Sequence, residues 1–201
     1  MRIGANQSAA LGDATRESIQ VLQEVLSAHR QGLVQDYLRV AELCRETARS
    51  LGLAEGTVVR IELAGRLHDI GKVAIPDAIL EKPGPLTRKE WELMRTHTEI
   101  GARIIGAAPA LGDVAEIVRC HHERFDGSGY PDGLRGDRIP IGASILAVCD
   151  SFVAMMRNRS YIDGITVMEA LAELRRCSGT QFDPRVVEAF ERAFRELFVA
   201  A

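Results

Sequence analysis

The sequence has few aromatic residues, few cysteines and no strong excess of charge of either sign. Of its 201 residues, 5% are Phe, Trp or Tyr, a single one being tryptophan, and the formal net charge is −3. A balance this close to neutral argues against a protein that coats nucleic acid or an anionic membrane through a basic surface. The hydrophobic share of 46% and the charged share of 26% exclude a disordered or fibrous chain and fit one globular domain.

The chain also lacks the cysteine pairs and the long apolar runs of exported or membrane-bound proteins. Its 4 cysteines form no C-x-x-C pair and lie in apolar or helical contexts, which predicts reduced thiols. The first residues, MRIGANQSAALGDATRES, hold no apolar core of a signal peptide. No run reaches the about 18 apolar residues of a membrane span. We therefore expect a cytoplasmic protein without membrane contact.

Apolar residues recur at helical spacing along most of the chain, and no alternating strand pattern of useful length occurs. Helix starts are marked by T-x-x-E capping boxes at Thr87 and Thr166, and by Asp183 followed by Pro184. These patterns predict an all-α fold, a compact bundle of about seven helices. The predicted helical segments cover residues 14–31, 33–51, 56–68, 87–105, 113–122, 141–156, 166–177 and 183–198.

Histidine and aspartate are the residues that suggest chemistry. Adjacent residues on a helix point about 100° apart, so His68-Asp69 and His121-His122 suit a pair of ions better than a single one. Asp150 lies in the apolar run ILAVCDSF, where a buried carboxylate is costly unless it is paired or binds a metal. A His/Asp set without thiolates suits Fe, Mn, Ni or Zn.

Each of these motifs also has a purely structural interpretation. His68-Asp69 can end a helix, and His121-His122 can interact with a helix dipole. His97, amid polar neighbours, can be an ordinary satisfied or exposed histidine, and His29 has no motif around it. The residues alone leave these alternatives open.

The order of the motifs resembles that of a known family. The segments HDIGKVAIPDAIL, HTEIGARII, HHERFDGSGYPDGL and AVCDSF occur as in the HD-GYP phosphodiesterases, a branch of the HD superfamily of metal-dependent phosphohydrolases, and the likeness covers residues 33–190. The resemblance implies an all-helical catalytic domain over residues 33–201, with the Gly/Pro-rich segment 124–140 as its GYP loop. It implies hydrolysis of cyclic di-GMP to pGpG and on to GMP. Residues 1–32 would then form an N-terminal helix serving as a linker or a homodimer contact.

The resemblance also implies roles for individual residues. Asp69 would bridge two divalent transition-metal ions that activate a water, and Lys72 would contact the substrate phosphate; we count both as catalytic. The other residues that the resemblance assigns to the metal site are His68, His97, His121, His122 and Asp150. Those that it assigns to substrate binding, with Lys72, are Gly129, Tyr130, Pro131, Gly133 and Arg159.

The sequence departs from the family at several of these positions. Asp36 stands where the family often has a histidine ligand; an aspartate can still bind a hard metal ion, so Asp36 is a further candidate ligand. Gly32 stands where three-metal members have a glutamate, so we expect two ions. Val153 replaces an acidic residue associated with guanine, and Ile162 replaces a basic phosphate contact. Two alternatives therefore stay open: metal-dependent hydrolysis of another nucleotide, such as a different cyclic dinucleotide or pGpG, and a non-enzymatic module that binds the messenger or a diguanylate cyclase through the GYP loop.

Overall fold

The structure, a computed structural model, describes residues 13–29, 31–157 and 166–198. Its regular elements over these ranges are helices. The only β-type pairing within them is one isolated bridge between Ser178 and Phe182. The predicted all-α bundle is therefore confirmed, although it is built from more and shorter helices than the sequence indicates. The helices are α1 (Asp13–His29), α2 (Val34–Ser50), α3 (Glu55–Leu67), α4 (Asp77–Leu80), α5 (Arg88–Arg95), α6 (His97–Gly106), α7 (Gly112–Cys120), α8 (Ile141–Arg157), α9 (Val167–Arg176) and α10 (Pro184–Phe198), with 3₁₀ turns η1 (Gln31–Leu33), η2 (Ile70–Ala74), η3 (Pro109–Leu111) and η4 (Gly136–Arg138).

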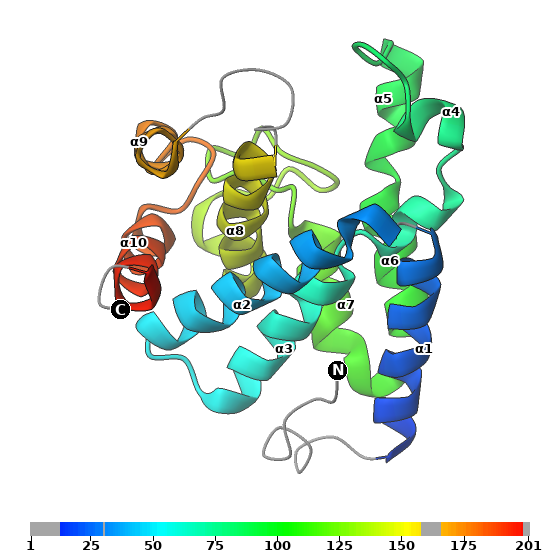
Figure 1. Ribbon diagram of the computed structural model, residues 1–201, viewed down its shortest axis with the longest axis horizontal. Helices are drawn as coiled ribbons and strands as arrows, with labels where there is room; N and C mark the ends of the chain where they lie inside the picture. Colours follow the sequence, from blue (N-terminus) through cyan, green and yellow to red (C-terminus); the bar gives the residue numbers. More distant parts are fainter. Residues whose placement is uncertain (1–12, 30, 158–165, 199–201) are drawn as a thin grey trace.

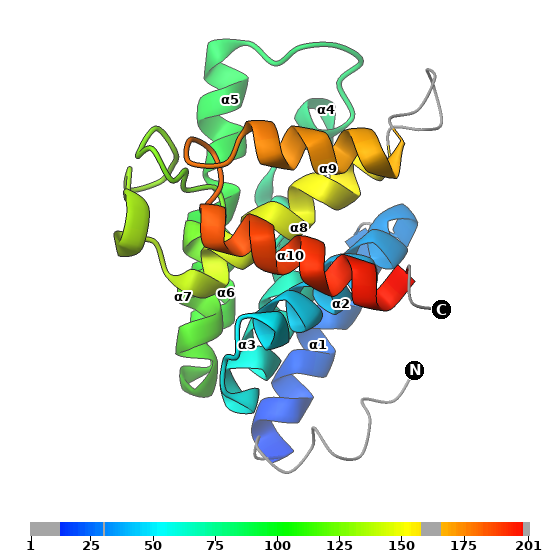
Figure 2. The same ribbon diagram turned by 90° about the vertical axis from the view of Figure 1, so that its left-hand side faces the viewer.

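Helix α2 lies at the centre of the bundle, where it packs against α3, α8 and α10 (Figure 1). Helices α9 and α10 cover the outer side of α8 (Figure 2). At that side, the ring of Phe152 lies 5.0 Å from that of Phe190 and 5.2 Å from that of Phe194, centroid to centroid. Helix α1 contributes Ile19 and Leu26 to the same core. One continuous apolar core thus fixes the helices that carry the histidines.

The predicted helix starts are confirmed where a cap was expected. Thr87 and Thr166 each form a complete capping box with the glutamate three residues later. Asp183 accepts a hydrogen bond from the backbone N–H of Arg185 at 2.9 Å, at the start of α10. These caps satisfy backbone groups that would otherwise lack a partner in the first turn.

The prediction of one helix over residues 87–105 is wrong, because the chain breaks into α5 and α6 at Thr96. The N–H of Thr96 bonds to the carbonyl of Leu93, three residues back, at 3.1 Å. The Thr96 hydroxyl donates to the same carbonyl at 2.7 Å and so competes with regular helical bonding. Helix α5 has no buried residue and projects from the body, whereas α6 is packed inside it (Figure 1).

A very close backbone contact joins η2 to the start of α6. A Cβ atom added at Gly71 would lie 1.9 Å from the carbonyl oxygen of His97, so no other residue fits there. This contact brings the segment after α3, which carries His68 and Asp69, against the helix that begins with His97.

Over the described ranges, the helices are too short or too polar to cross a lipid bilayer.

Candidate metal centre

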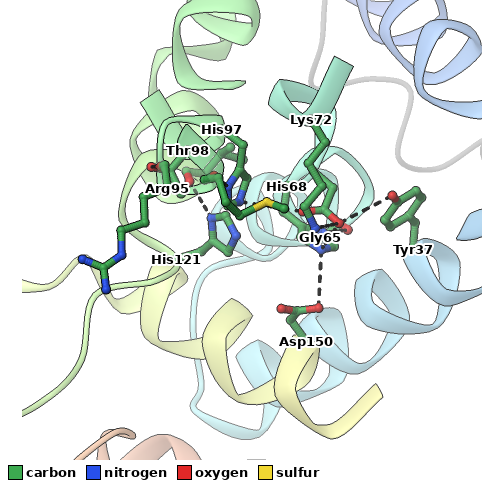
Figure 3. Close-up of polar contacts among 12 residues, drawn as sticks. Tyr37, Gly65, His68, Lys72, Arg95, His97, Thr98, His121 and Asp150 are labelled. Carbon is green, nitrogen blue, oxygen red and sulfur yellow. Dashed lines mark hydrogen bonds and ion pairs between the residues drawn. The ribbon is translucent and has the colours of Figure 1, made fainter. Parts of the chain in front are cut away.

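Four separate elements bring the predicted His and Asp side chains to one place (Figure 3). His68 and Asp69 follow directly after α3, and Asp150 comes from α8. His121 caps the C-terminus of α7, and His97 begins α6. His97 is 1% exposed, so the interpretation as an exposed histidine is wrong.

Three of the imidazole rings are oriented in the same way. The Nδ1 atoms of His68, His97 and His121 lie 2.9, 2.7 and 2.6 Å from the carbonyl oxygens of the residues three positions earlier. A carbonyl only accepts, so each Nδ1 carries the proton that it donates. In a neutral ring the lone pair is then on Nε2, which is the arrangement found in metal-binding histidines.

The Nε2 atoms of this cluster are the donors a metal ion needs. Those of His97 and His121 are buried and have no hydrogen-bond partner within the described residues. His97, His121 and His122 each offer a ligand atom within 4.8 Å of the others, so His121 and His122 can serve one ion, contrary to the expectation from their adjacent positions. A buried polar nitrogen without a partner is costly. The donor set therefore fits a divalent metal ion, which would satisfy these atoms.

Asp69 lies between the two halves of the cluster. Its Oδ2 is 3.6 Å from His68 Nε2, and its Oδ1 is 3.9 Å from His97 Nε2. On the Oδ2 side, Lys72 Nζ donates at 2.7 Å and the Tyr37 hydroxyl donates at 3.5 Å. The carboxylate thus presents one oxygen to each group of imidazoles, as a bridging ligand must.

Asp150 is less buried than its apolar sequence context predicts. Its side chain is 30% exposed, because it faces the cavity and not the core. The Oδ1 atom lies 3.5 Å from His68 Nε2, and a dashed line marks this contact in Figure 3. Asp69 and Asp150 thus approach His68 together.

The charges of the cluster shift its pKa values in opposite directions. Burial alone would lower the pKa of His68, but Asp69 and Asp150 raise it to about 9. Burial, helped by His68 and His97, lowers the pKa of His121 to about 3. Burial would raise the pKa of Asp69, but Lys72 and the two nearest histidines hold it well below its ordinary value. The centre therefore combines an ionised Asp69 with a neutral His121, and a metal ion would replace the proton that the two carboxylates favour on His68.

The GYP loop is anchored beside His122 by a residue that the sequence analysis missed. Glu123 is 3% exposed and accepts the backbone N–H groups of Asp132 at 2.7 Å and Leu134 at 3.0 Å. The signal that could have found it is a glutamate within HHERF, directly after a helix end and before a loop rich in backbone donors. Its carboxylate therefore connects the start of the loop to the backbone at Asp132 and Leu134.

Gly129 is required by packing of the loop against the chain just after α7. A Cβ there would lie 2.3 Å from the backbone nitrogen of Arg124. The next residue, Tyr130, donates its N–H to the carbonyl of His122 at 3.2 Å. Its ring centroid lies 5.0 Å from that of His122. The Tyr130–Pro131 peptide bond is cis, and Gly133 has a positive φ of 66°.

Two further predicted positions have surroundings that the sequence could not indicate. Asp36 lies in the cavity next to the cluster and forms an ion pair with Arg157 at 3.6 Å. This cavity of about 250 Å³ is also lined by Lys72 and Val153. Arg159 and Ile162 lie outside the described residues.

Residues 20–186 match the sequence profile of the family described as "HD domain". The chain is 47% identical over 161 residues to a cyclic di-GMP phosphodiesterase of Thermotoga maritima, covering 79% of this chain and 44% of that protein. It is 42% identical over 185 residues to the cyclic di-GMP phosphodiesterase response regulator RpfG of Xanthomonas campestris, covering 90% of this chain and 49% of that protein. It is 42% identical over 180 residues to a 3′3′-cGAMP-specific phosphodiesterase of Vibrio cholerae, covering 89% of this chain and 34% of that protein. The chain thus spans between a third and a half of the length of these relatives.

Solved structures share the fold at lower identity. A cyclic GMP-AMP-specific phosphodiesterase of V. cholerae superposes with a TM-score of 0.65 and 19% identity, covering 92% of this chain and 50% of that one. The HD domain of the Listeria monocytogenes phosphodiesterase PgpH, in complex with cyclic di-AMP, gives 0.61 and 15%, covering 88% and 97%.

The chain belongs to the HD-domain family, and the resemblance to its HD-GYP branch is confirmed by these relatives. HD-domain phosphohydrolases depend on metal ions, and the histidine cluster of this chain can hold one.

Proposed function

We propose that this chain is a metal-dependent phosphodiesterase that hydrolyses cyclic di-GMP to pGpG and then to GMP. The observation that carries the proposal is the position of Asp69, with one oxygen directed to His68 and the other to His97. Such a carboxylate suits two ions about 3.5–4 Å apart, the arrangement used for phosphoryl chemistry. The relatives named cyclic di-GMP phosphodiesterases support the choice of substrate.

The donor set supports a division of the ligands between two ions of Fe, Mn, Ni or Zn. His97, His121 and His122 would hold one ion, and His68 with Asp150 the other, with Asp69 shared. When bound, the ions would lower the pKa of a water and offset the negative charge of the phosphate.

Lys72 serves the same reaction from the chain itself. Its ammonium group lines the cavity next to Asp150 and is 23% exposed on its side chain, so it can reach a ligand there. A phosphate oxygen in this cavity would accept a hydrogen bond from Lys72, and the ammonium would offset its charge. Arg159 would add a second cation.

The test is turnover by anaerobically purified protein loaded with Mn or Fe. Cyclic di-GMP is added, and pGpG and GMP are followed by chromatography. We expect both products from the wild type and loss of at least a hundredfold in rate for Asp69→Ala. No product from the wild type with any of the four metals, or an unchanged rate for Asp69→Ala, would refute the proposal. Elemental analysis of about two ions per chain is expected, and three would contradict the division above.

A second candidate substrate is 3′3′-cGAMP. The V. cholerae relatives named for this substrate favour it, as does Val153, an apolar residue in the cavity where the family has an acid. Parallel assays with cyclic di-GMP, 3′3′-cGAMP and pGpG at equal concentration decide between them by the ratio of kcat/KM.

We also propose that residues 1–32 form an N-terminal helix separate from the catalytic domain of residues 33–201, and that the chain has the two protein partners predicted from the sequence. Helix α1 leaves Val21 62% and Val25 45% exposed on one side while Ile19 and Leu26 enter the core. We propose that this exposed stripe is a linker or homodimer contact. Sedimentation of wild type and Val21→Lys tests it, since a monomer in both cases contradicts a dimer through α1. A diguanylate cyclase partner for the GYP loop stays a prediction, tested by co-sedimentation with such an enzyme.

A further inference from the structure

A second cleft lies beside His122 and shares no lining residue with the cavity that contains Lys72. It has a volume of about 650 Å³ and is lined by α5, His122 and the GYP loop. This size is typical of small-molecule sites. The residues that line it are Arg88, Trp91, Glu92, Arg95, His122 and Tyr130.

One wall of this cleft is a stack of flat groups that begins at the histidine cluster. The ring of His122 lies 4.0 Å from that of His121, and the ring of Tyr130 lies 5.0 Å further along, tilted by 31°. The guanidinium of Arg95 then lies over Tyr130, 5.1 Å from the ring centroid. The stack therefore runs from the candidate metal ligands to the open cleft.

Trp91, the only tryptophan of the sequence, also lines this cleft and lies on α5 about one helical turn before Arg95. It is 46% exposed on a helix without buried residues, so core packing does not account for it. An indole and a guanidinium–tyrosine pair that face one cleft offer two flat surfaces for a planar ligand. They have the composition of sites that stack nucleobases.

We propose that this cleft is a nucleobase subsite, in which Trp91 and the Arg95–Tyr130 pair stack one purine of a cyclic dinucleotide while its phosphate lies at the histidine cluster. The inference rests on the proposed function for the identity of the ligand, but it concerns binding of the base and not the chemical step. Stacking uses the face that every purine has. The platform therefore accepts guanine and adenine alike.

The intrinsic tryptophan fluorescence of the protein reports on this cleft directly, since Trp91 is the only tryptophan of the sequence. The metal-loaded protein is titrated with GMP, AMP and ribose 5-phosphate. We expect quenching by both nucleotides and none by ribose 5-phosphate, which has the phosphate without the base. Equal responses to GMP and ribose 5-phosphate, or no response to GMP at millimolar concentration, would overturn the subsite. This measurement needs no turnover, so it stands even if the protein fails to hydrolyse cyclic di-GMP.

Kinetics of variants give the second readout. Stacking of one base contributes about 1–3 kcal/mol, which corresponds to a rise in KM of roughly 5- to 150-fold on its loss. We expect this rise for Trp91→Ala and Arg95→Ala, with cyclic di-GMP and 3′3′-cGAMP affected alike, and substantial rescue in Trp91→Phe. Lys89→Ala, on the same exposed helix but outside the cleft, is the matched control and should match the wild type. An unchanged KM in Trp91→Ala and Arg95→Ala, or an effect of Lys89→Ala as large as theirs, would overturn the proposal.

Discussion

The ammonium group of Lys72 lies 2.7 Å from Oδ2 of Asp69, the carboxylate that stands between the two groups of histidines. The pair occupies one turn of η2 and the residue before it, so it is fixed by local backbone geometry. A positive charge this close lowers the pKa of Asp69, and it also faces the cavity where a phosphate would lie. In the proposed function the same lysine would therefore act on a candidate ligand and on the substrate.

Replacement of Lys72 by Gln should separate these two roles. We expect the metal content to stay at the wild-type level, because every candidate ligand is kept. The kcat for cyclic di-GMP should fall by about 10²–10³, the usual cost of removing one group that stabilises charge in the transition state. The measurements are elemental analysis and steady-state kinetics.

Lys82→Gln is the control for this variant, because Lys82 pairs with Glu90 at 2.6 Å on the surface. It should leave kcat unchanged. A Lys72→Gln enzyme with wild-type kcat would show that the cavity does not receive the phosphate beside Lys72.

The elements recovered from the sequence are those whose signals are local. The capping boxes at Thr87 and Thr166 need only residues three apart, and helical spacing needs only one element at a time. The break at Thr96 could not be predicted because threonine is tolerated in a helix. The constraint on the backbone position of the next residue, His97, comes from its close contact with Gly71 in another element. Tertiary contact overrides propensity in such cases.

In the candidate site, too, some features could be predicted from the sequence and others could not. The order of the motifs indicated that His68, His97 and His121 belong together. It could not indicate that each donates Nδ1–H to the carbonyl three residues earlier, since this depends on ring orientation. Glu123 and Trp91 were missed because their partners, the backbone of the GYP loop and an open cleft, have no pattern in the sequence.

Glu123 should control the order of the GYP loop. In Glu123→Leu the N–H groups of Asp132 and Leu134 lose their acceptors. A hydrogen bond to a charged group contributes about 1.5–3 kcal/mol, so we expect a lower urea midpoint and faster amide exchange over residues 124–140. Glu116→Leu, on the exposed side of α7, should change neither. Equal protection of the loop in wild type and Glu123→Leu would show that its fold does not depend on this carboxylate.

Gly71 should tolerate no side chain. The Cβ of Gly71→Ala would lie 1.9 Å from His97 O and 2.6 Å from the backbone nitrogen of Gly101, so α6 must move. Overpacking of this kind costs about 1–3 kcal/mol or more. Because the displaced helix carries His97, metal affinity should fall together with the thermal midpoint.

Gly112→Ala is the matched control for Gly71→Ala, since a Cβ there meets nothing within 4 Å and the residue begins α7. We expect wild-type stability or a slight gain. If both alanine variants behave alike by calorimetry and metal titration, the close approach of η2 to α6 does not hold the site together.

Metal binding should stabilise the protein through the histidines whose Nε2 atoms lack partners. A ligand that binds only the folded state at a hundred times its dissociation constant adds about 2.7 kcal/mol to the free energy of unfolding. We expect Mn or Zn to raise the thermal midpoint of chelator-treated protein, and His97→Gln to reduce that rise. His29→Gln provides a strict comparison, because His29 Nε2 is also buried and has no hydrogen-bond partner among the residues that the structure describes, but is outside the three-histidine group. A metal-induced shift lost equally in His29→Gln and His97→Gln would mean that the ion binds elsewhere. A shift lost only in His97→Gln would place it among His97, His121 and His122.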